Sequence, residues 1–314
     1  MIALRQAGCD ALGVDLKASP HTGAVGSIAD RAFVRECMRG AGAVLHAATL
    51  HKPHVATHTQ AQFVETNVTG TLNLLEEALA QGAGRFVFTS TTSAFGAALT
   101  PAEGQPAAWI AEDVAPVPRN IYGVTKVAAE GLCELFHRRD GLACLVLRTS
   151  RFFPEEDDRR ETREAYSGEN AKVNELLHRR VDVQDVVAAH VLALERAPAL
   201  GFGRYIISAT TPFRREDAAV LRANAPEVVR RRFPGFERVY AERGWRMFPA
   251  IDRVYDNALA RAQLGWRPEY DFGRALEALA RGRDPRSPLA IAVGAKGYHD
   301  RAFAEGPYPV DGAR

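Results

Sequence analysis

Short β-like runs alternate with helical stretches through the first two-thirds of this 314-residue chain. The runs that favour strands cover residues 11–15, 43–46, 85–89, 143–148 and 204–208. The stretches between them carry apolar residues three and four apart, which is the period of a helix with one buried face. Such alternation is typical of a parallel sheet with crossover helices. The sequence therefore predicts an α/β fold with a Rossmann-like, doubly wound parallel sheet.

The pattern changes after residue 211. Short arginine-rich helices, broken by proline and aromatic residues, follow over 212–314. We expect a smaller, mostly helical substrate-binding lobe there, with a loosely ordered tail from 281 that is rich in glycine, proline and charge. The region 1–211 then forms a dinucleotide-binding domain, with a substrate-side insertion around 151–178.

Composition excludes several classes of protein. A net charge of +2 leaves no concentrated basic field, so nucleic-acid and membrane-surface roles are disfavoured. No apolar stretch approaches the roughly 20 residues that cross a bilayer. The cysteines lack C-x-x-C spacing and fall in predicted helices and strands, as expected of reduced, packed thiols in a cytoplasmic protein. These cysteines are Cys9, Cys37, Cys133 and Cys144.

The segment "NIYGVTK" carries the clearest chemical signal. Tyr122 and Lys126 lie four residues apart at the start of a predicted helix, so both side chains share one face. A free phenol has a pKa near 10, and an ammonium one turn away stabilises the phenolate that a proton acceptor must become. A surface pair without a role is the alternative, and the neighbouring motifs decide between the two.

Three of those motifs lie upstream. "RFVFTSTTSAFG" is a strand that runs into hydroxyl residues, including Thr89 and Thr91, at the end where open α/β sheets bind ligands. "AVLHAAT" is a strand that ends in small residues. "ETNVTGT" places Asn67 inside a predicted helix, where an amide is a mediocre helix former unless it bonds something.

Together with "RRVDVQDVVAAH", these motifs occur in the order found in the extended short-chain dehydrogenase/reductases. The chain resembles their NAD-dependent epimerase/dehydratase family, which includes UDP-galactose 4-epimerase, over 11–208, with "LGWRP" as a weaker echo near the end. The resemblance implies a cytoplasmic, homodimeric enzyme that acts as an oxidoreductase or isomerase on a hydroxyl-bearing substrate. A nucleotide sugar is the leading expectation for that substrate.

The resemblance also implies roles for four catalytic residues. Thr91 matches the Ser/Thr that hydrogen-bonds the reacting oxygen, and Tyr122 matches the residue that transfers the proton. Lys126 matches the residue that lowers the tyrosine pKa and holds the nicotinamide ribose. Asn67 matches the helix-bending asparagine of a proton relay.

NAD is the implied cofactor. Asp15 matches the acidic residue that accepts the adenosine ribose hydroxyls, and a carboxylate there repels the 2′-phosphate of NADP. Ser27 replaces the family's adenine-binding aspartate, and His51 stands where related epimerases place a cofactor-contacting lysine. The expected cofactor contacts are Asp15, Ser27, Ile28, Ala47, Ala48, Thr49, His51, Thr89, Tyr122 and Lys126.

Substrate contacts are expected at Thr91, Thr92, Arg151 and Arg180. Arg151 stands where sugar epimerases have a substrate-contacting asparagine, and its guanidinium suits a phosphate or carboxylate. Pairing of Arg151 with the acidic run at 155–158 is the alternative.

Two segments resemble metal sites in composition only. His51, His54 and His58 lie close together in sequence without an interleaved carboxylate, and residues 155–158 are consecutive carboxylates beside arginines. A cleft-lining loop and a solvated, self-paired loop are the favoured interpretations, so we expect no metal.

In dinucleotide-binding folds a glycine-rich turn precedes the acidic ribose ligand by about 20 residues. Counting back from Asp15 places that turn before Met1. We therefore expect a first strand and its glycine-rich turn in some twenty further residues upstream of this sequence. Two alternatives stay open: a ketone, aldehyde or hydroxysteroid-type reductase of the same fold, and a non-catalytic relic or binding protein.

Overall fold

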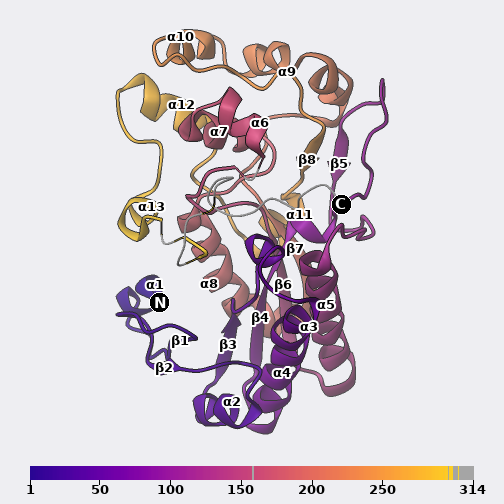
Figure 1. Cartoon of the computed structure of the whole chain (residues 1–314), viewed down its shortest axis with the longest axis vertical. Coiled ribbons are helices and arrows are strands. Elements are labelled where there is room, and N and C mark those ends of the chain that lie inside the picture. Colours follow the sequence, from indigo (N-terminus) through magenta and orange to yellow (C-terminus); the bar gives the residue numbers. More distant parts are fainter. Residues whose placement is uncertain (158, 296, 300–302, 304–314) are drawn as a thin grey trace. The chain divides into compact units, whose positions relative to one another are not determined.

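The structure of the chain is a computed structural model that describes residues 1–157, 159–295, 297–299 and 303 (Figure 1). Its strands are β1 (Val14–Asp15), β2 (Ala24–Val25), β3 (Ala43–His46), β4 (Arg85–Thr91), β5 (Ala108–Ile110), β6 (Ala143–Thr149), β7 (Phe202–Ile207) and β8 (Arg253–Tyr255). Its α-helices are α1 (Ile2–Gln6), α2 (Arg31–Met38), α3 (Gln60–Val64), α4 (Gly70–Ala80), α5 (Ile121–Asp140), α6 (Arg160–Ala165), α7 (Gly168–Glu175), α8 (Val183–Leu200), α9 (Ala218–Arg232), α10 (Phe236–Ala241), α11 (Ala258–Leu264), α12 (Phe272–Ala280) and α13 (Pro288–Val293). Short 3₁₀ turns occur at η1 (Lys52–His54), η3 (Thr92–Ala94) and η4 (Arg215–Asp217), and η2 (Glu65–Thr69) is π-helical.

A four-stranded sheet with the order β3-β4-β6-β7 forms the centre of the fold. β3 and β4 run parallel, with Ala43 opposite Arg85 and His46 opposite Phe88. β1 and β2 form a separate parallel pair, and so do β5 and β8. The predicted parallel sheet with crossover helices is thus confirmed.

The strand boundaries test the predictions one by one. The strand at 43–46 is confirmed, and those predicted at 85–89, 143–148 and 204–208 are present with ends shifted by one or two residues. The strand predicted at 11–15 is wrong in length, because only Val14 and Asp15 pair with a neighbour. β2, β5 and β8 were not predicted, since two or three residues give no periodic signal.

The chain divides into two compact units that are interleaved in sequence. Unit 1 comprises Met1–Ala94, Pro118–Leu147 and His190–Arg204, and unit 2 comprises Phe95–Val117, Arg148–Ala189 and Tyr205–Arg314. The sequence, in contrast, predicts a linear division at residue 211. The predicted insertion at 151–178 lies within unit 2.

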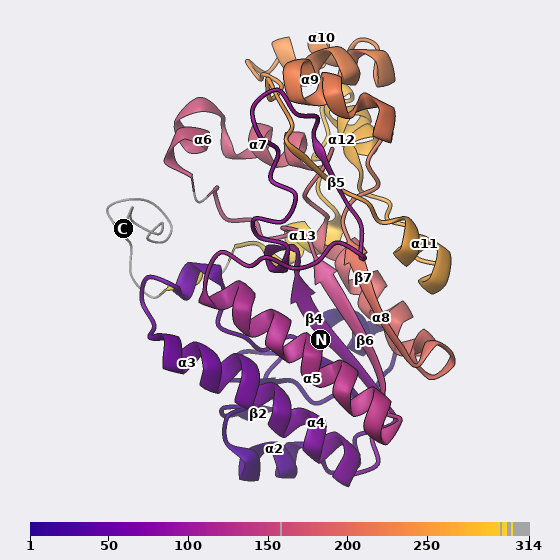
Figure 2. The same ribbon diagram turned by 90° about the vertical axis from the view of Figure 1, so that its right-hand side faces the viewer.

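Unit 1 is built on β3 and β4, against which α4 and α5 pack. Figure 2 shows α2 beside α4. Its core joins apolar side chains from both strands and from these helices. Phe86, Val87 and Phe88 of β4 are fully buried, whereas Ala43, Val44 and Leu45 of β3 are only partly buried. The core includes Val34, Leu75, Phe86, Phe88, Ala129, Cys133, Phe136, Cys144 and Val146.

Unit 2 has its own apolar core. Helices α7, α9, α10 and α12 contribute to it, and Phe236, Tyr240 and Phe272 pack edge-on or tilted within it. α13 lies within the predicted loose tail, of which residues 296, 300–302 and 304–314 lie outside the described residues. The smaller helical part predicted from the sequence is thus confirmed as helical.

Two further predictions concern membranes and thiols. No helix in the described part of the chain combines the length and the apolar character that a bilayer crossing needs. Cys133 and Cys144 are buried free thiols, as expected of packed cysteines. Cys9 is exposed, so the expectation of a packed thiol is wrong there, because α1 buries none of its residues.

Two glycines on helices of unit 1 make a matched test of this packing. A Cβ on Gly70 meets Cγ1 and Cδ1 of buried Ile28 at 2.6 Å, whereas a Cβ on Gly131 in α5 meets nothing within 4 Å. We expect Gly70→Ala to lower the free energy of unfolding by about 1–3 kcal/mol through overpacking. Gly131→Ala should raise it by up to about 1 kcal/mol. Urea denaturation of both variants measures this, and equal effects would contradict the packing of Ile28 on α4.

Candidate functional site

The start of α5 is held by two local features. The side chain of Asn120 caps the helix by accepting a hydrogen bond from the backbone N–H of Gly123. A Cβ at Gly123 would lie 2.8 Å from Pro118 Cβ and 3.1 Å from the carbonyl oxygen of Ser93. Glycine therefore lets the first turn of α5 approach the segment that follows β4.

This close approach brings Tyr122 to Thr91, the last residue of β4. The two side chains are hydrogen-bonded, and both are buried. Thr91 Oγ1 also accepts a hydrogen bond from the backbone N–H of Ser93. Thr92, predicted as a further substrate contact, is the first residue of η3 and is buried as well. The structure thus brings Thr91 and Tyr122 together.

Lys126 lies one turn further along α5 and is 1% exposed. Its Nζ donates a hydrogen bond of 2.6 Å to the carbonyl oxygen of Thr89 on β4 and lies 4.0 Å from the centre of the Phe88 ring. The Thr89 hydroxyl is hydrogen-bonded to Nε2 of His190 at 2.7 Å. The ammonium and the phenol therefore lie on one face of α5, next to the carboxyl end of β4, as their spacing predicts.

The electrostatics of this pair differ from the prediction. Burial raises the pKa of Tyr122 to about 12, although the hydrogen bond from Thr91 lowers it. Burial lowers the pKa of Lys126 to about 7, against the opposing charge of Glu130. The expectation that Lys126 brings the tyrosine pKa below its ordinary value is therefore wrong for this structure, because desolvation dominates and the ammonium is bonded to Thr89.

Asn67 lies in the π-helical turn η2 between α3 and α4, a geometry that is frequent at functional sites. Its Oδ1 accepts hydrogen bonds from Thr49 Oγ1 at 2.8 Å and from the Leu50 N–H at 2.7 Å. Its Nδ2 donates to the Leu50 carbonyl and to Thr125 Oγ1, each at 3.0 Å. Asn67 thus links the segment after β3 to α5. Thr125 was not predicted, since its position lies between the two motif residues of α5.

His51 belongs to the same region of unit 1. Its ring lies 5.8 Å from the Tyr122 ring, measured between centroids. Burial, followed by the charges of Lys126 and His54, lowers the pKa of His51 to about 3, so the ring is neutral near pH 7. His54 and His58 contact each other edge to face at 5.0 Å. Within the described residues, no three His, Cys, Asp or Glu side chains are grouped as a metal site needs.

The residues expected at a dinucleotide fall at the ends of parallel strands. Asp15 ends β1 as an exposed carboxylate, and its Oδ1 accepts a hydrogen bond from the Lys17 N–H. Ala47 and Ala48 are exposed directly after β3. Ser27 caps the turn after β2 by accepting from the Ala29 N–H.

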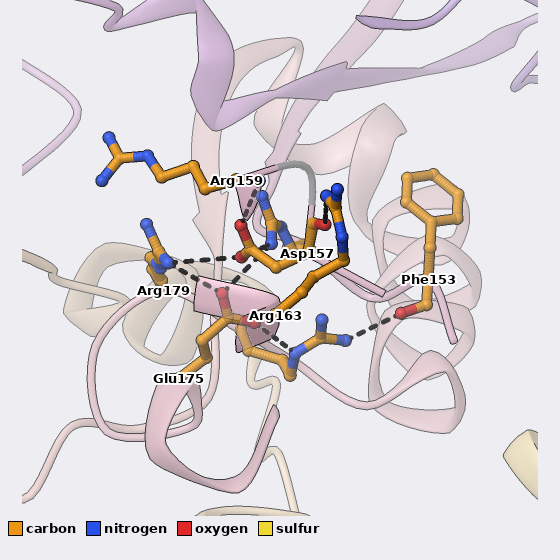
Figure 3. Close-up of polar contacts among 8 residues, drawn as sticks. Phe153, Asp157, Arg159, Arg163, Glu175 and Arg179 are labelled. Atoms are coloured by element: carbon orange, nitrogen blue, oxygen red, sulfur yellow. Dashed lines mark hydrogen bonds and ion pairs between the residues drawn. The ribbon is translucent and has the colours of Figure 1, made fainter. Parts of the chain in front are cut away.

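Arg151 and Arg180 belong to unit 2, where they meet acidic side chains. Figure 3 shows Asp157 and Glu175, the carboxylates of this region, with Arg179 beside them. Arg151 is paired with Asp157 and lies 3.2 Å from Glu175, and Arg180 lies 2.8 Å from Glu175. Arg179 adds a third guanidinium at 2.9 Å from Glu175. The alternative of pairing with the acidic run therefore describes Arg151 in this structure, while Asp158 lies outside the described residues.

Glu175 is the centre of this arginine cluster, defined as Arg151, Asp157, Glu175, Arg179 and Arg180. It ends α7 and is 1% exposed. Burial alone would raise the pKa of Glu175, but the guanidinium groups overcome it and hold that pKa well below its usual range. The sequence analysis missed Glu175, because a glutamate at a helix end is usually solvated.

Comparison with known proteins accounts for the order of these motifs. The model of the NAD dependent epimerase/dehydratase family matches residues 2–207. The chain belongs to this family. It is 36% identical over 107 residues to GDP-6-deoxy-D-mannose reductase of Pseudomonas aeruginosa, covering 34% of each chain. It is 27% identical over 263 residues to UDP-glucose 4-epimerase of Rhizobium meliloti, covering 75% of each.

Solved structures share this fold. A short-chain dehydrogenase/reductase superfamily protein from Agrobacterium tumefaciens with bound NAD superposes with a TM-score of 0.62 at 22% identity, covering 93% of this chain and 94% of the other. In several of its curated relatives, the chain spans only about a third of their length. NAD is the cofactor of the family.

The buried ammonium of Lys126 makes stability depend on pH. Its pKa is about 7 in the folded chain and 10.5 ordinarily, so between these values the unfolded chain binds the extra proton. Stability therefore rises with pH in that window, by up to about 1.4 kcal/mol per pH unit. We expect Lys126→Met to remove this rise between pH 7 and pH 9 in urea denaturation. Lys17→Met, at an exposed position, is the control, and an unchanged slope in Lys126→Met would contradict the burial.

The contacts of the arginine cluster predict that neutralising Glu175 strongly lowers the free energy of unfolding. We expect Glu175→Gln to cost about 3 kcal/mol or more, because it leaves buried Arg180 without its carboxylate. Since the folded pKa of Glu175 is depressed, the loss should be full near pH 7 and shrink as pH falls below the ordinary value of 4.5. Glu169→Gln, exposed on the same helix, is the control for denaturation measurements. Equal stabilities of the two variants would contradict this role.

Proposed function

We propose that this chain is an NAD-dependent oxidoreductase of the epimerase/dehydratase type, acting on a hydroxyl group of a nucleotide-linked sugar. The observation that carries the proposal is the hydrogen bond between Tyr122 and Thr91 at the carboxyl end of β4, with Lys126 one turn along α5. Ligands of open α/β sheets bind outside the carboxyl ends of the strands.

In this mechanism Tyr122 transfers the proton of the reacting hydroxyl. Thr91 donates its hydrogen bond toward the phenol oxygen, and its own orientation is fixed by the N–H of Ser93. With a pKa near 12, Tyr122 is protonated at neutral pH, so this state is ready to donate a proton to a substrate oxygen. Proton acceptance in the opposite direction requires a positive charge close to the phenol.

Lys126 and Asn67 hold the surroundings of that phenol. Lys126 has a pKa of about 7, so its Nζ gains or loses a proton near neutral pH. Asn67 joins Thr49 and Leu50, next to the small residues after β3, to Thr125 on α5. This fixes the loop after β3 relative to the helix that carries Tyr122.

The cofactor would be held by residues at the ends of neighbouring strands. Asp15 suits the ribose hydroxyls of the adenosine half, while Ala47 and Ala48 allow the dinucleotide to approach the backbone. Lys126 and Tyr122 suit the nicotinamide ribose. When bound, NAD supplies the hydride acceptor or donor and, in its oxidised form, a positive charge.

The side chains of unit 2 support the proposal that the substrate is an anion. Arg151, Arg179 and Arg180 outnumber the carboxylates of Asp157 and Glu175 in the arginine cluster. The buried Nε of Arg179 has no acceptor within the described residues. Guanidinium groups of this kind bind phosphate strongly, as the diphosphate of a nucleotide sugar requires. The names of the relatives in the family, among them a UDP-glucose 4-epimerase and a dTDP-glucose 4,6-dehydratase, support the same substrate class.

Tyr122→Phe tests the proposal. With UDP-glucose and NAD, we expect the variant to lose activity by a factor of about 100 or more, because general acid–base catalysis contributes that much. Equilibrium binding of NAD should change little, since the ring and its contact with His51 remain. Nicotinamide absorbance separates the reaction types: an epimerase produces no net reduced cofactor, whereas a ketone or aldehyde reductase consumes it stoichiometrically.

Asp113→Asn, outside the proposed machinery, serves as the control for expression and handling. Full activity of Tyr122→Phe would overturn the assignment of the proton-transferring residue. Failure of the unaltered chain to bind NAD would instead favour a binding protein or a non-catalytic relic of the same fold.

A further inference from the structure

Glu130 is a buried carboxylate that the proposed reaction does not use. It lies on α5, four residues after Lys126, and is 1% exposed. Its Oε1 accepts a hydrogen bond of 2.6 Å from Ser90 Oγ on β4, and its Oε2 lies 3.4 Å from Nε of Arg204 on β7. An isolated buried carboxylate is costly, and these contacts help to offset that cost.

The contacts of Ser90 and Thr89 form a matched pair. These neighbours on β4 bind residues one turn apart on α5: the carbonyl of Thr89 accepts from Lys126, and the hydroxyl of Ser90 donates to Glu130. Each hydrogen bond measures 2.6 Å. Two such bonds at successive strand positions fix both the rotation and the translation of the helix relative to the strand.

We propose that Glu130 is a positioning residue for Lys126: bonded to Ser90 and ion-paired with Arg204, its carboxylate holds the helical turn that places the ammonium at the end of β4. This role rests on the proposed function, in which Lys126 faces the cofactor and supports Tyr122.

Glu130 affects Lys126 through its charge as well as through its position. The carboxylate raises the pKa of Lys126 against the lowering by burial, and the Cys133 thiol further along α5 acts in the same direction. The other titratable groups around the ammonium are Tyr122, protonated at neutral pH, and the neutral rings of His46 and His51. Among these neighbours, Glu130 supplies the negative charge that keeps Lys126 partly protonated at neutral pH.

Arg204 weakens the electrostatic effect of Glu130 on Lys126, because it is a cation close to the Glu130 carboxylate. It lies near Glu130 Oε2 and, at 2.7 Å, pairs with Glu134 one turn further along α5. The Arg204 side chain is 28% exposed, so solvent screens part of its charge. Neutralising Glu130 and neutralising Arg204 should therefore shift the Lys126 titration in opposite directions.

The test follows the titration of Lys126 directly. The sequence has five lysines, so ¹³C labelling at the lysine ε-carbon gives a spectrum simple enough to assign, with Lys126→Arg identifying the signal of interest. In the full chain, we expect Glu130→Gln to lower the Lys126 midpoint by roughly one pH unit. Glu134→Gln, which alters the other carboxylate of Arg204 at a more exposed position, should leave the midpoint in place.

Arg204→Gln keeps the proposal testable if Glu130→Gln does not fold. Loss of this cation should raise the Lys126 midpoint. An unchanged midpoint in either Glu130→Gln or Arg204→Gln, or an equal shift in Glu134→Gln, would overturn the proposal. Because the readout needs no substrate, it separates this inference from the proposed function: a shifted midpoint in a chain without turnover supports the positioning role and contradicts the reaction.

Discussion

Burial of the Lys126 ammonium is the interaction on which the site depends. Removing a cation from water is costly, and the fold offsets that cost with a carbonyl, an aromatic face and a nearby carboxylate. The Thr89 carbonyl and the Phe88 ring both come from β4, and Glu130 comes from α5 itself. The cost of the buried charge is therefore met only when α5 is correctly seated on β4, and the same seating brings Tyr122 to Thr91.

Desolvation explains why the chemistry of the tyrosine differs from what spacing alone predicts. The four-residue separation of Tyr122 and Lys126 is correctly predicted to place both on one helix face, but spacing does not reveal how dry that face is. Burial disfavours the charged form of each group, so it raises the pKa of the phenol and lowers that of the amine. The two pKa values, ordinarily close together, thus move apart, so that near neutral pH the phenol keeps its proton while the amine titrates.

The sequence predicted elements whose signal is local and missed those that depend on tertiary contacts. Apolar runs in the sequence predict the strand at 43–46 and β4, whose end carries hydroxyl side chains. The π-helical turn at Asn67 lies where an amide interrupts a predicted helix. Glu175 could not be found in this way, because a glutamate on a helix looks solvated until three arginines are folded around it. The division into units was equally hidden, since the chain leaves unit 1 at residue 95 and re-enters it at 118 and at 190.

Glu175 and Glu130 are both buried glutamates, but their charges are compensated to different extents. Glu175 is held by Arg151, Arg179 and Arg180, so it is an anion whose charge is more than compensated. Glu130 is bonded to Ser90 and lies near a partly exposed guanidinium, and its charge raises the pKa of Lys126. In the arginine cluster Glu175 holds three guanidinium groups together. In α5 the carboxylate acts on a single cation, whose protonated form it favours against the effect of burial.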